Sequence, residues 1–365
     1  MTGIYIHIPF CKSKCPYCDF YSFKADEKTK DSYLTAVLSC LEKYSDKITD
    51  SIDTVYFGGG TPSFFGGERI KEVLCYIKDN YKVTKDAEIT VECNPSSVDE
   101  TLVKSLTEAG ANRISMGMQS AVDKERVSLG RLSDRERIRE SIELFRHYGI
   151  DNISLDLMLG IPYQTKESLR ESIDFVSSMK VNHISAYMLK IEEDTEFHRI
   201  RDNLPLPDED AVCDLYLYAC EQLSDAGFSQ YEISNFAKEA YESRHNLRYW
   251  HCEEYLGVGP SAHSFIDGKR FYFERDFDSF LKGASPIPDG EGGNEEEYIM
   301  LALRLSEGLQ NEKYRMRFGK NIDERLIKKA RTLEKEGLVT VAVDRISLTV
   351  KGFLVSNSVI SYLLN

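Results

Sequence analysis

The first half of the chain alternates short runs of β-branched and apolar residues with longer stretches of helical periodicity. In the helical stretches apolar residues recur every three or four positions, as Ile70, Val73 and Ile77 do. The runs typical of buried strands begin near Tyr5, Thr54, Glu88, Arg113, Asn152 and His183. Six uninterrupted β–α units predict a parallel, barrel-like sheet, and such sheets carry function at the carboxyl ends of their strands.

Two turn-rich segments divide the rest of the chain. Residues 203–210 (NLPLPDED) predict a connection, and residues 285–294 (SPIPDGEGGN) predict a linker. We therefore expect a partial barrel over residues 1–205, a connecting region over 206–290 and a smaller α+β domain over 291–365. The pattern of this C-terminal domain, with two helices, two short strands and a final helix, predicts a winged-helix-like outline.

Charge decides whether this outline indicates DNA binding. Residues 295–365 hold 12 Lys and Arg against 10 Asp and Glu, and the whole chain has a formal net charge of −14. An acidic chain repels phosphate backbones, and a balanced domain lacks the basic surface that contacts them. We expect no nucleic-acid partner, which disfavours a DNA-binding regulator.

The composition also bears on location. No run approaches the ~18 apolar residues that span a bilayer, and the start, MTGIYIHIPFCKSKC, lacks the features of a secretory signal. Nine cysteines, an odd number, argue against a disulfide scaffold. We expect a soluble, cytoplasmic protein without a transmembrane segment.

Three of the cysteines lie on one short loop directly after the first expected strand. Cys11, Cys15 and Cys18 have a C-x3-C-x2-C spacing, which lets three thiolates ligate three corners of an iron–sulfur cube and leaves the fourth iron without a protein ligand. The alternatives are a zinc site completed by His7, or inert buried thiols. The other six mostly fall in helical or strand patterns and are expected as small core residues: Cys40, Cys75, Cys93, Cys213, Cys220 and Cys252.

A glycine-rich motif, GGGTP at residues 58–62, ends the second strand run. Glycines at such a position let a ligand approach the backbone and leave N–H groups free for a carboxylate or phosphate. A tight turn would explain the motif equally well. Its expected place beside the cysteine loop, on the same rim of the sheet, favours a ligand site.

In this order, the two motifs resemble those of the radical S-adenosylmethionine (SAM) superfamily. Within it, the chain resembles the oxygen-independent coproporphyrinogen III oxidase group from residue 1 almost to the end. The further motifs that carry the resemblance are VECNP with Glu92, SMGMQS with Gln119, LGR with Arg131 and DLMLGIPYQT from Asp156. The resemblance implies a partial (β/α)6 radical-SAM barrel.

The resemblance also implies cofactor roles. Cys11, Cys15 and Cys18 would hold a [4Fe-4S] cluster, whose open iron binds the amino and carboxylate groups of SAM. The residues implied to contact SAM are Tyr5, Tyr17, Gly59, Gly60, Thr61, Glu92, Gln119, Arg131 and Asp156. The last three match contacts to a second SAM in the oxidase, so one or two molecules remain open. As alternatives, Glu92 is a solvated strand-end carboxylate and the isolated polar residues are structural.

Other features distinguish the chain from the oxidase itself. Phe20 stands where the oxidase has a fourth cysteine, and we expect the oxidase's N-terminal extension to be absent because Tyr5 almost opens the chain. Residues 245–250 (HNLRYW) match the HNxxYW motif of the related HemW group of haem chaperones, and GVGPSAH follows at 257–263.

The HNxxYW resemblance implies a haem site. An imidazole can ligate haem iron, and Tyr and Trp can pack on the macrocycle. We expect His245 as the ligand, with His251 or His263 in reserve. Because the motif lies far along the sequence from the cysteines, we expect this site to be independent of the cluster. The alternative is a buried His–Asn pair beside Trp250.

The sequence thus predicts a chaperone that binds haem and transfers it to an acceptor protein. It also predicts a SAM-bound cluster that receives electrons from a donor. The alternative is an oxygen-independent coproporphyrinogen III oxidase, which decarboxylates its substrate through a radical derived from SAM. Whether the protein is an enzyme stays open.

Overall fold

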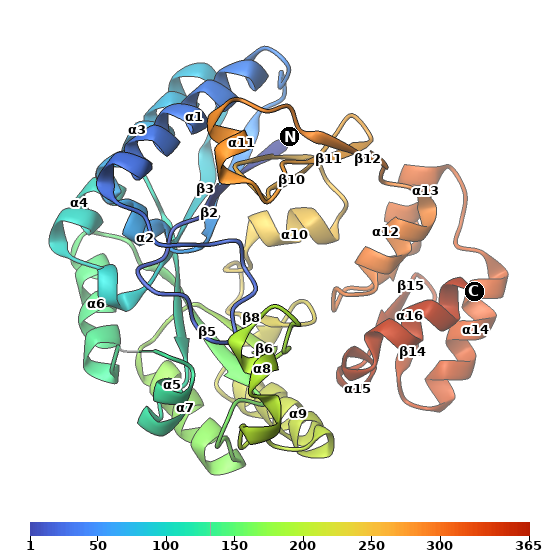
Figure 1. Cartoon of the computed structure of the whole chain (residues 1–365). Helices are drawn as coiled ribbons and strands as arrows, with labels where there is room; N and C mark the ends of the chain where they lie inside the picture. The colour runs from blue at the N-terminus through green and yellow to red at the C-terminus, as the bar shows by residue number, and fades with distance from the viewer. Residues whose placement is uncertain (132) are drawn as a thin grey trace.

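The computed structural model describes residues 1–131 and 133–365, which form one large sheet with outer helices and a smaller C-terminal unit (Figure 1). The six expected strands are present, parallel, and adjacent in chain order. Their bounds are Thr2–Ile8 (β1), Ile52–Gly59 (β2), Val83–Cys93 (β3), Arg113–Gln119 (β4), Asn152–Leu159 (β5) and His183–Met188 (β6). The predicted β/α architecture is therefore confirmed.

The helices that connect these strands lie on the outer side of the sheet (Figure 1), and their apolar faces join one continuous core. They are Glu27–Ser45 (α1), Pro62–Phe65 (α2), Gly67–Asn80 (α3), Glu100–Ala109 (α4), Asp123–Ser128 (α5), Arg135–His147 (α6) and Lys166–Ser178 (α7), with a 3-10 turn at Pro95–Ser97. After α4, Gly110 adopts a φ of 85°, the left-handed cap that glycine favours.

Residues 206–290, expected as a connecting region, supply strands to both edges of the large sheet. Their strands are Ser229–Gln230 (β7), Asn235–Ala237 (β8), Tyr255–Val258 (β9), His263–Ile266 (β10), Lys269–Tyr272 (β11) and Ile287–Glu291 (β12). The order is β12-β11-β10-β9-β1-β2-β3-β4-β5-β6-β8-β7, and β9 pairs with β1 in parallel. The linker expected at 285–294 is thus partly an edge strand.

Further helices complete this region of the chain. They are Glu196–Arg199 (α8), Glu209–Asp225 (α9), Arg244–Trp250 (α10) and Phe277–Leu281 (α11), with a 3-10 turn at Arg201–Asn203.

The C-terminal unit has the helix and strand order of a winged helix. Its elements are Glu295–Ala302 (α12), Leu309–Gln310 (β13), Asn311–Phe318 (α13), Glu324–Lys335 (α14), Val339–Val341 (β14), Arg345–Leu348 (β15), Val350–Leu354 (α15) and Ser356–Leu364 (α16). The antiparallel sheet has the order β13-β15-β14. The outline predicted from sequence lacked α13 and β13, which are too short and polar to show a clear period.

The C-terminal unit attaches to the barrel through the turn between β7 and β8. The N–H of Ile233 donates to the carbonyl of Arg304 at 3.0 Å, and the N–H of Ser306 donates to the carbonyl of Tyr231 at 3.0 Å. These backbone hydrogen bonds join the C-terminal unit to the segment between β7 and β8.

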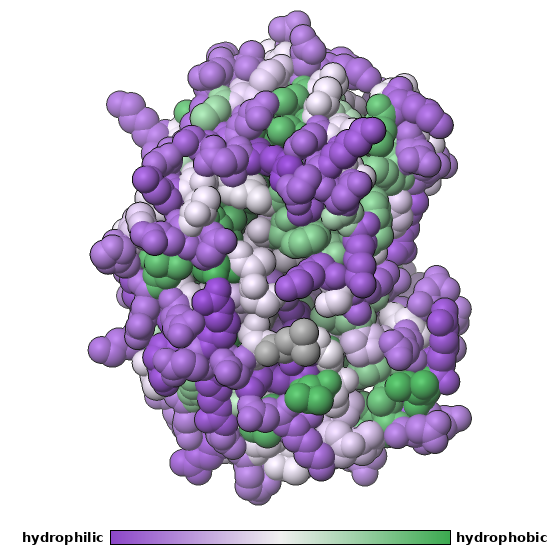
Figure 2. Space-filling view, turned by 60° about the vertical axis from the view of Figure 1, so that its left-hand side comes forward, coloured by the Kyte–Doolittle hydropathy of each residue, from purple (hydrophilic) through white to green (hydrophobic). Residues whose placement is uncertain are grey.

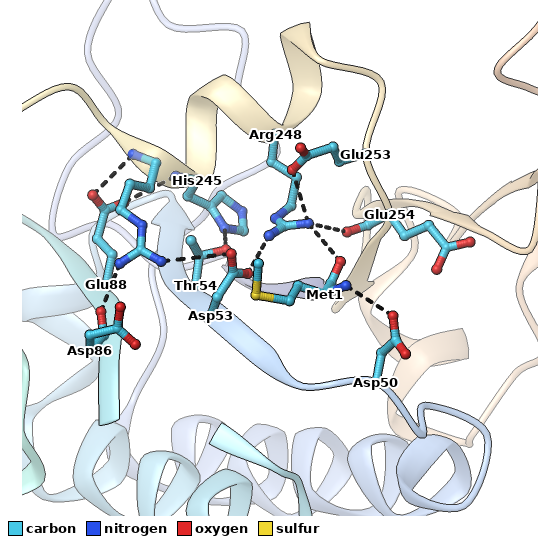
Figure 3. A network of polar contacts seen from close by, with 11 residues as sticks. Met1, Asp50, Asp53, Thr54, Asp86, Glu88, His245, Arg248, Glu253 and Glu254 are labelled. Atoms are coloured by element: carbon cyan, nitrogen blue, oxygen red, sulfur yellow. Dashed lines mark hydrogen bonds and ion pairs between the residues drawn. The ribbon is translucent and has the colours of Figure 1, made fainter. Parts of the chain in front are cut away.

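Helix α10, which carries HNxxYW, lies against the amino-terminal end of β2 (Figure 3). Its Arg248 is buried and forms an ion pair with Asp53, the second residue of β2. The same guanidinium donates to the carbonyls of Met1 at 2.9 Å and Glu254 at 3.2 Å. One arginine thereby joins α10, β2 and the segment before β1.

Glu88 of β3 holds the amino end of the same helix. Its carboxylate accepts the N–H of Arg244 at 3.0 Å and that of His245 at 3.1 Å. An acid at a helix amino terminus stabilises the free N–H groups and the helix dipole. The end of the barrel opposite the cysteine loop is therefore closed by a helix that is held by an ion pair and by hydrogen bonds to Glu88.

The face in Figure 2 is mostly hydrophilic, and its apolar residues form small separate patches. In the described ranges, no helix combines the length and apolarity that a membrane span needs.

We predict that Arg248→Ala lowers the free energy of unfolding by about 3–5 kcal/mol, because it leaves the carboxylate of Asp53 buried with only the longer contact to Arg244 at 3.7 Å. Urea denaturation measures this loss. The matched control is Arg170→Ala, which removes an exposed pair with Asp174 and should change stability little. A loss below about 1 kcal/mol for Arg248→Ala would contradict the structural role of α10.

Candidate functional site

The three motif cysteines line one cavity of about 320 Å³ at the carboxyl end of the barrel strands. Cys11, Cys15 and Cys18 lie on the loop between β1 and α1 and are half-buried. Burial raises the pKa of the Cys18 thiol. The Sγ of Cys11 lies 3.3 Å from the Oγ1 of Thr61, so the cysteine and GGGTP loops meet on one rim as expected.

His7 is not free to complete a zinc site with these cysteines. Its Nδ1 contacts the hydroxyl of Tyr5 at 3.1 Å, and its Nε2 contacts the carbonyl of Tyr21 at 3.1 Å. Burial lowers the pKa of His7 to about 4. The imidazole therefore supports the loop that carries the cysteines through the carbonyl of Tyr21. The zinc alternative, which needed His7 as its fourth ligand, loses that ligand.

The other cysteines divide into two groups. Cys40, Cys93, Cys220 and Cys252 are buried, as expected of small core residues. The expectation is wrong for Cys75 and Cys213, which are exposed. Both lie on helices, where one residue in the apolar pattern can still face solvent, so helical spacing alone did not separate them from the core.

The backbone N–H groups of the GGGTP loop are already hydrogen bonded, contrary to the expectation that they are free. Gly60 donates to the carbonyl of Ile8 at 2.7 Å and Thr61 to that of Phe10 at 2.8 Å, while Gly59 donates to a carboxylate. A Cβ on Gly60 would lie 2.8 Å from both carbonyl oxygens. Glycine is therefore required here for close contact with the cysteine loop, whatever ligand the cavity takes.

Glu92 is the carboxylate that holds this turn. Its Oε2 accepts the N–H of Gly59 at 3.2 Å, and its Oε1 accepts the hydroxyl of Tyr56 at 2.8 Å. Burial raises the pKa of Glu92 to about 7, even though the bond from Tyr56 opposes this rise. The alternative of a solvated strand-end carboxylate does not describe it.

The opposite wall of the cavity carries the other polar residues of the motifs. Arg131 donates through Nε and Nη2 to the hydroxyl of Tyr17, at 3.2 and 2.9 Å. Asp156 is half-buried, and desolvation in the cavity raises its pKa to about 6. Gln119 ends β4 with a φ of 64°, and its buried Oε1 lacks a hydrogen-bond partner within the described ranges. A positive φ and an unsatisfied amide at one residue indicate a position kept for a ligand.

Tyr5 was expected to contact SAM near the cluster and the adenine, but it is not among the residues that line the cavity. Its ring packs 6.1 Å from that of Tyr56 and 6.4 Å from that of His245. Burial raises its pKa well above the usual value. Tyr5 therefore supports the site through other side chains instead of lining it.

His245 is buried in the barrel beneath these rings. Its Nδ1 contacts Thr54 Oγ1 at 2.8 Å and its Nε2 contacts the hydroxyl of Tyr249 at 2.8 Å. It is 1% exposed, and burial lowers its pKa to about 3. In this conformation neither ring nitrogen can reach an iron, and its contacts agree with the alternative of a buried polar cluster. Figure 3 shows the ring pointing down toward Thr54.

The HNxxYW helix is also not remote from the cysteines, contrary to the expectation of an independent site. Its Asn246 lines the same cavity as Cys11, Cys15 and Cys18. The reserve histidines differ: His251 contacts Glu307 at 3.0 Å, whereas His263 is exposed and stacks on Tyr272 with ring centroids 5.2 Å apart.

Several lining residues were not singled out from the sequence. The additional polar and aromatic residues of the cavity wall include Tyr56, Arg113, Ser115, Ser185, Tyr187, Ser234 and Asn235. From Arg113 on, every second residue of the strand is charged, small or polar. This alternation marks an inward polar face, and it could have been detected in the sequence.

The comparisons with known proteins agree with this geometry. Residues 5–176 match the family model of the radical SAM superfamily, and residues 296–355 match that of the HemN C-terminal domain. "Heme chaperone HemW" of Bacillus subtilis (strain 168) is 33% identical, over 98% of this chain and 98% of the relative. The chain belongs to the HemW family.

Other HemW relatives show similar agreement. The protein of Mycobacterium tuberculosis (strain ATCC 25618 / H37Rv) is 33% identical, over 99% of this chain and 94% of its own length. That of Escherichia coli (strain K12) is 36% identical, over 73% of this chain and 71% of its own length.

Among solved structures, coproporphyrinogen III oxidase (HemN) from Escherichia coli matches with a TM-score of 0.86. The match has 21% identity and covers 99% of this chain and 89% of that chain. At this identity the likeness establishes the fold, a radical-SAM barrel followed by a smaller C-terminal domain.

We predict that Glu92 makes a contribution to the stability of the cofactor-free protein that falls as the pH rises from about 5 to 7. Burial places the pKa of Glu92 near 7, above its usual 4.5, so the folded state holds a proton that the unfolded state has lost. The Glu92→Gln variant should lack this part of the pH dependence, which amounts to up to roughly 3 kcal/mol of unfolding free energy over the range, since a tenfold change in an ionisation constant is about 1.4 kcal/mol.

Urea denaturation at a series of pH values measures the slope. Glu100→Gln is the control, because Glu100 lies at the surface where Tyr148 donates to it. An equal slope in native protein and Glu92→Gln would mean that Glu92 titrates normally.

Proposed function

We propose that this HemW family member binds haem and transfers it to an acceptor protein, and that it carries a [4Fe-4S] cluster with SAM. The main support for this proposal is similarity to proteins named haem chaperones over 98% of the chain. In addition, the three loop cysteines and most of the motif residues line one cavity. This combination supports a chaperone with radical-SAM cofactors.

The donor set of the cavity fits these cofactors. Cys11, Cys15 and Cys18 would hold the cluster as three cysteines of one loop that line one cavity, although in this conformation the described residues bring no three metal-ligating side chains together. When bound and reduced, the cluster supplies an electron that can cleave the sulfonium of SAM. The buried, unpaired Oε1 of Gln119 offers an acceptor for a ligand donor such as an amino or hydroxyl group.

The residues around the cofactors have separable roles. Glu92 keeps Gly59 and the turn in place and offers a carboxylate beside it. Arg131 orients the phenol of Tyr17 at the mouth of the cavity. Thr61 contacts Cys11, and Asp156 provides a second half-buried carboxyl in the cavity. Together they exclude water and fix orientation, whether one or two SAM molecules bind.

Haem binding requires a separate argument about histidines. His263 presents an exposed ring next to Tyr272, an aromatic surface on which a macrocycle can pack. His245 could ligate iron only after its bonds to Thr54 and Tyr249 break. Within our proposal, His263 is the ligand when α10 is closed and His245 requires α10 to open.

The remaining elements of the proposal concern the cell. All nine cysteines are free thiols, which supports a reducing compartment such as the cytoplasm. The cluster would need an electron donor, and haem an acceptor protein. The balanced charge of the winged-helix unit supports protein or haem contacts over nucleic acid.

One anaerobic experiment tests the function. Reconstituted protein is offered haem in one tube and coproporphyrinogen III with SAM and reductant in the other. A stoichiometric Soret shift without decarboxylated product supports the chaperone. Decarboxylated product would instead identify the oxidase, and neither signal would reject both functions.

We predict that Cys11→Ala, Cys15→Ala and Cys18→Ala each lose most cluster iron and sulfide after anaerobic reconstitution, because each thiolate ligates a different iron. The matched controls are Cys75→Ala and Cys213→Ala, whose thiols are exposed outside the cavity. Full iron content in Cys15→Ala, or zinc in the native protein, would contradict the assignment.

We predict that His263→Ala weakens haem binding and shifts the Soret band by removing an imidazole ligand, while Cys11→Ala still takes up haem. His245→Ala tests the motif, and His251→Ala is the control. If His245→Ala alone changes the haem spectrum while its melting temperature and cluster content match the native protein, α10 opens on binding and His245 is the ligand.

A further inference from the structure

Tyr56 connects the cofactor cavity to a line of aromatic rings that runs through the barrel. The tyrosines that line the cavity are Tyr17, Tyr56 and Tyr187. Within the described ranges, only the ring of Tyr56 among them packs on the ring of another tyrosine or a histidine. Tyr17 packs on Phe197 instead, with ring centroids 6.2 Å apart. The line of rings therefore begins at Tyr56.

The line continues from Tyr56 through α10 to β9. The Tyr56 ring stacks on that of His245 with centroids 5.2 Å apart, and the His245 ring lies 5.2 Å from that of Tyr249. Tyr249 lies 4.6 Å from Tyr255, a half-buried residue at the start of β9. Tyr5 forms a branch whose ring lies 6.1 Å from that of Tyr56. Since electron transfer between rings slows steeply with distance, rings this close can exchange electrons efficiently.

Two tyrosines of the line have a partner that can exchange their phenolic proton. Tyr56 donates to Oε1 of Glu92 at 2.8 Å, and burial raises the pKa of Glu92 to about 7. The hydroxyl of Tyr249 contacts Nε2 of His245 at 2.8 Å. A phenol is oxidised far more easily when its proton can leave with the electron, because this avoids a charged radical inside the barrel.

Tyr5 on the branch has the best-defined proton acceptor. Nε2 of His7 contacts the carbonyl of Tyr21 at 3.1 Å, so this nitrogen carries the ring proton, because a carbonyl only accepts. Burial lowers the pKa of His7 to about 4, so its Nδ1 is unprotonated near neutral pH. This Nδ1 lies 3.1 Å from the hydroxyl of Tyr5 and accepts its proton. Tyr5 can therefore hold an oxidising equivalent as a neutral radical.

The proposed cofactors would bring one-electron oxidants into the cavity. Cleavage of SAM yields an alkyl radical, and a reduced cluster that meets dioxygen yields oxygen radicals. Both kinds of radical form bonds to hydrogen that are stronger than the O–H bond of a phenol. Cysteine oxidation beyond the sulfenic acid is largely irreversible, so another target for these radicals would preserve the cluster ligands.

We propose that Tyr56, Tyr249 and Tyr255 carry an oxidising equivalent from the cofactor cavity to solvent, with Tyr5 as a branch. The inference rests on the proposed function, whose cofactors supply the oxidant as an alkyl radical from SAM or as an oxygen radical. At Tyr255 a thiol in solution removes the equivalent without damage to the cavity.

Each step of the path moves one electron, and each proton moves to a neighbouring group. The oxidant takes the hydrogen atom of the Tyr56 hydroxyl and is reduced, which leaves a neutral Tyr56 radical. This radical takes an electron from Tyr249 across the ring of His245 and a proton from Glu92, which regains one from solvent in the cavity. The proton of Tyr249 passes to His245 and returns when Tyr255 gives up its electron and releases its own proton to solvent. The thiol then returns an electron and a proton to Tyr255 and becomes a thiyl radical.

The first test needs neither SAM nor the cluster. A ruthenium polypyridyl label is attached to Cys11 of the full chain, which also carries Cys15→Ser, Cys18→Ser, Cys75→Ser and Cys213→Ser. A light flash with a soluble electron acceptor turns the label into a one-electron oxidant at the cavity. Freeze-quench electron paramagnetic resonance detects tyrosyl radicals, and mass spectrometry of spin-trap adducts locates them.

We expect spin-trap adducts on Tyr255 in this labelled protein, and loss of most of them in Tyr56→Phe and in Tyr249→Phe, because phenylalanine keeps the ring but is not oxidised by the label. Tyr187→Phe is the matched control, since Tyr187 lines the cavity but packs on no tyrosine or histidine ring in the described part of the chain. Equal amounts of the Tyr255 adduct with and without Tyr249→Phe would overturn the proposal. Circular dichroism checks the fold, and if one of the two variants fails to fold, the other decides.

A second test separates the two oxidants and uses reduced, reconstituted protein freed of excess reductant. One arm receives SAM without oxygen, and the other receives air without SAM. Tyr255 adducts in the SAM arm assign the path to the alkyl radical, and adducts in the air arm assign it to oxygen radicals. In the arm that gives adducts, Tyr249→Phe should raise the oxidised fraction of Cys15 and Cys18. Absence of adducts from both arms overturns the role at the cofactors. If no cluster assembles, the proposed function fails, and the flash experiment still judges the path.

Discussion

The interior of this barrel is polar, and the structure depends on an ion pair that closes the end opposite the cysteines. The ion pair between Arg248 and Asp53, together with the carboxylate of Glu88 at the amino end of α10, achieves this at the end opposite the cysteines. Removing such groups from water is costly unless each finds a partner. A short helix with paired polar contacts therefore replaces the apolar plug that a barrel would otherwise need.

This closure reaches the cofactor end through side chains in contact. The ring of His245 stacks 5.2 Å from that of Tyr56, whose hydroxyl donates to Glu92, which in turn holds the N–H of Gly59. His7 connects Tyr5 to the cysteine loop in a parallel path. The HNxxYW motif thus helps to support the cofactor cavity, and any haem role of His245 requires that support to change.

The local features of this architecture could be predicted from sequence. Strand and helix periods indicated the parallel sheet and the winged-helix outline, and two loops that follow neighbouring strands had to meet, as Cys11 and Thr61 do. Contacts between distant segments could not be predicted. No local pattern places α10 under β2 or leaves Gln119 Oε1 and Arg113 Nε without partners, because these features depend on contacts between segments far apart in the sequence.

An anaerobic crystal structure of the reconstituted protein with SAM tests the central claim, that one cavity unites the cysteine loop, the motif residues and α10. The account predicts a [4Fe-4S] cluster on Cys11, Cys15 and Cys18, SAM in the space lined by Glu92 and Gln119, and α10 still closed. A single metal ion at the cysteines, or SAM bound outside this cavity, would contradict it.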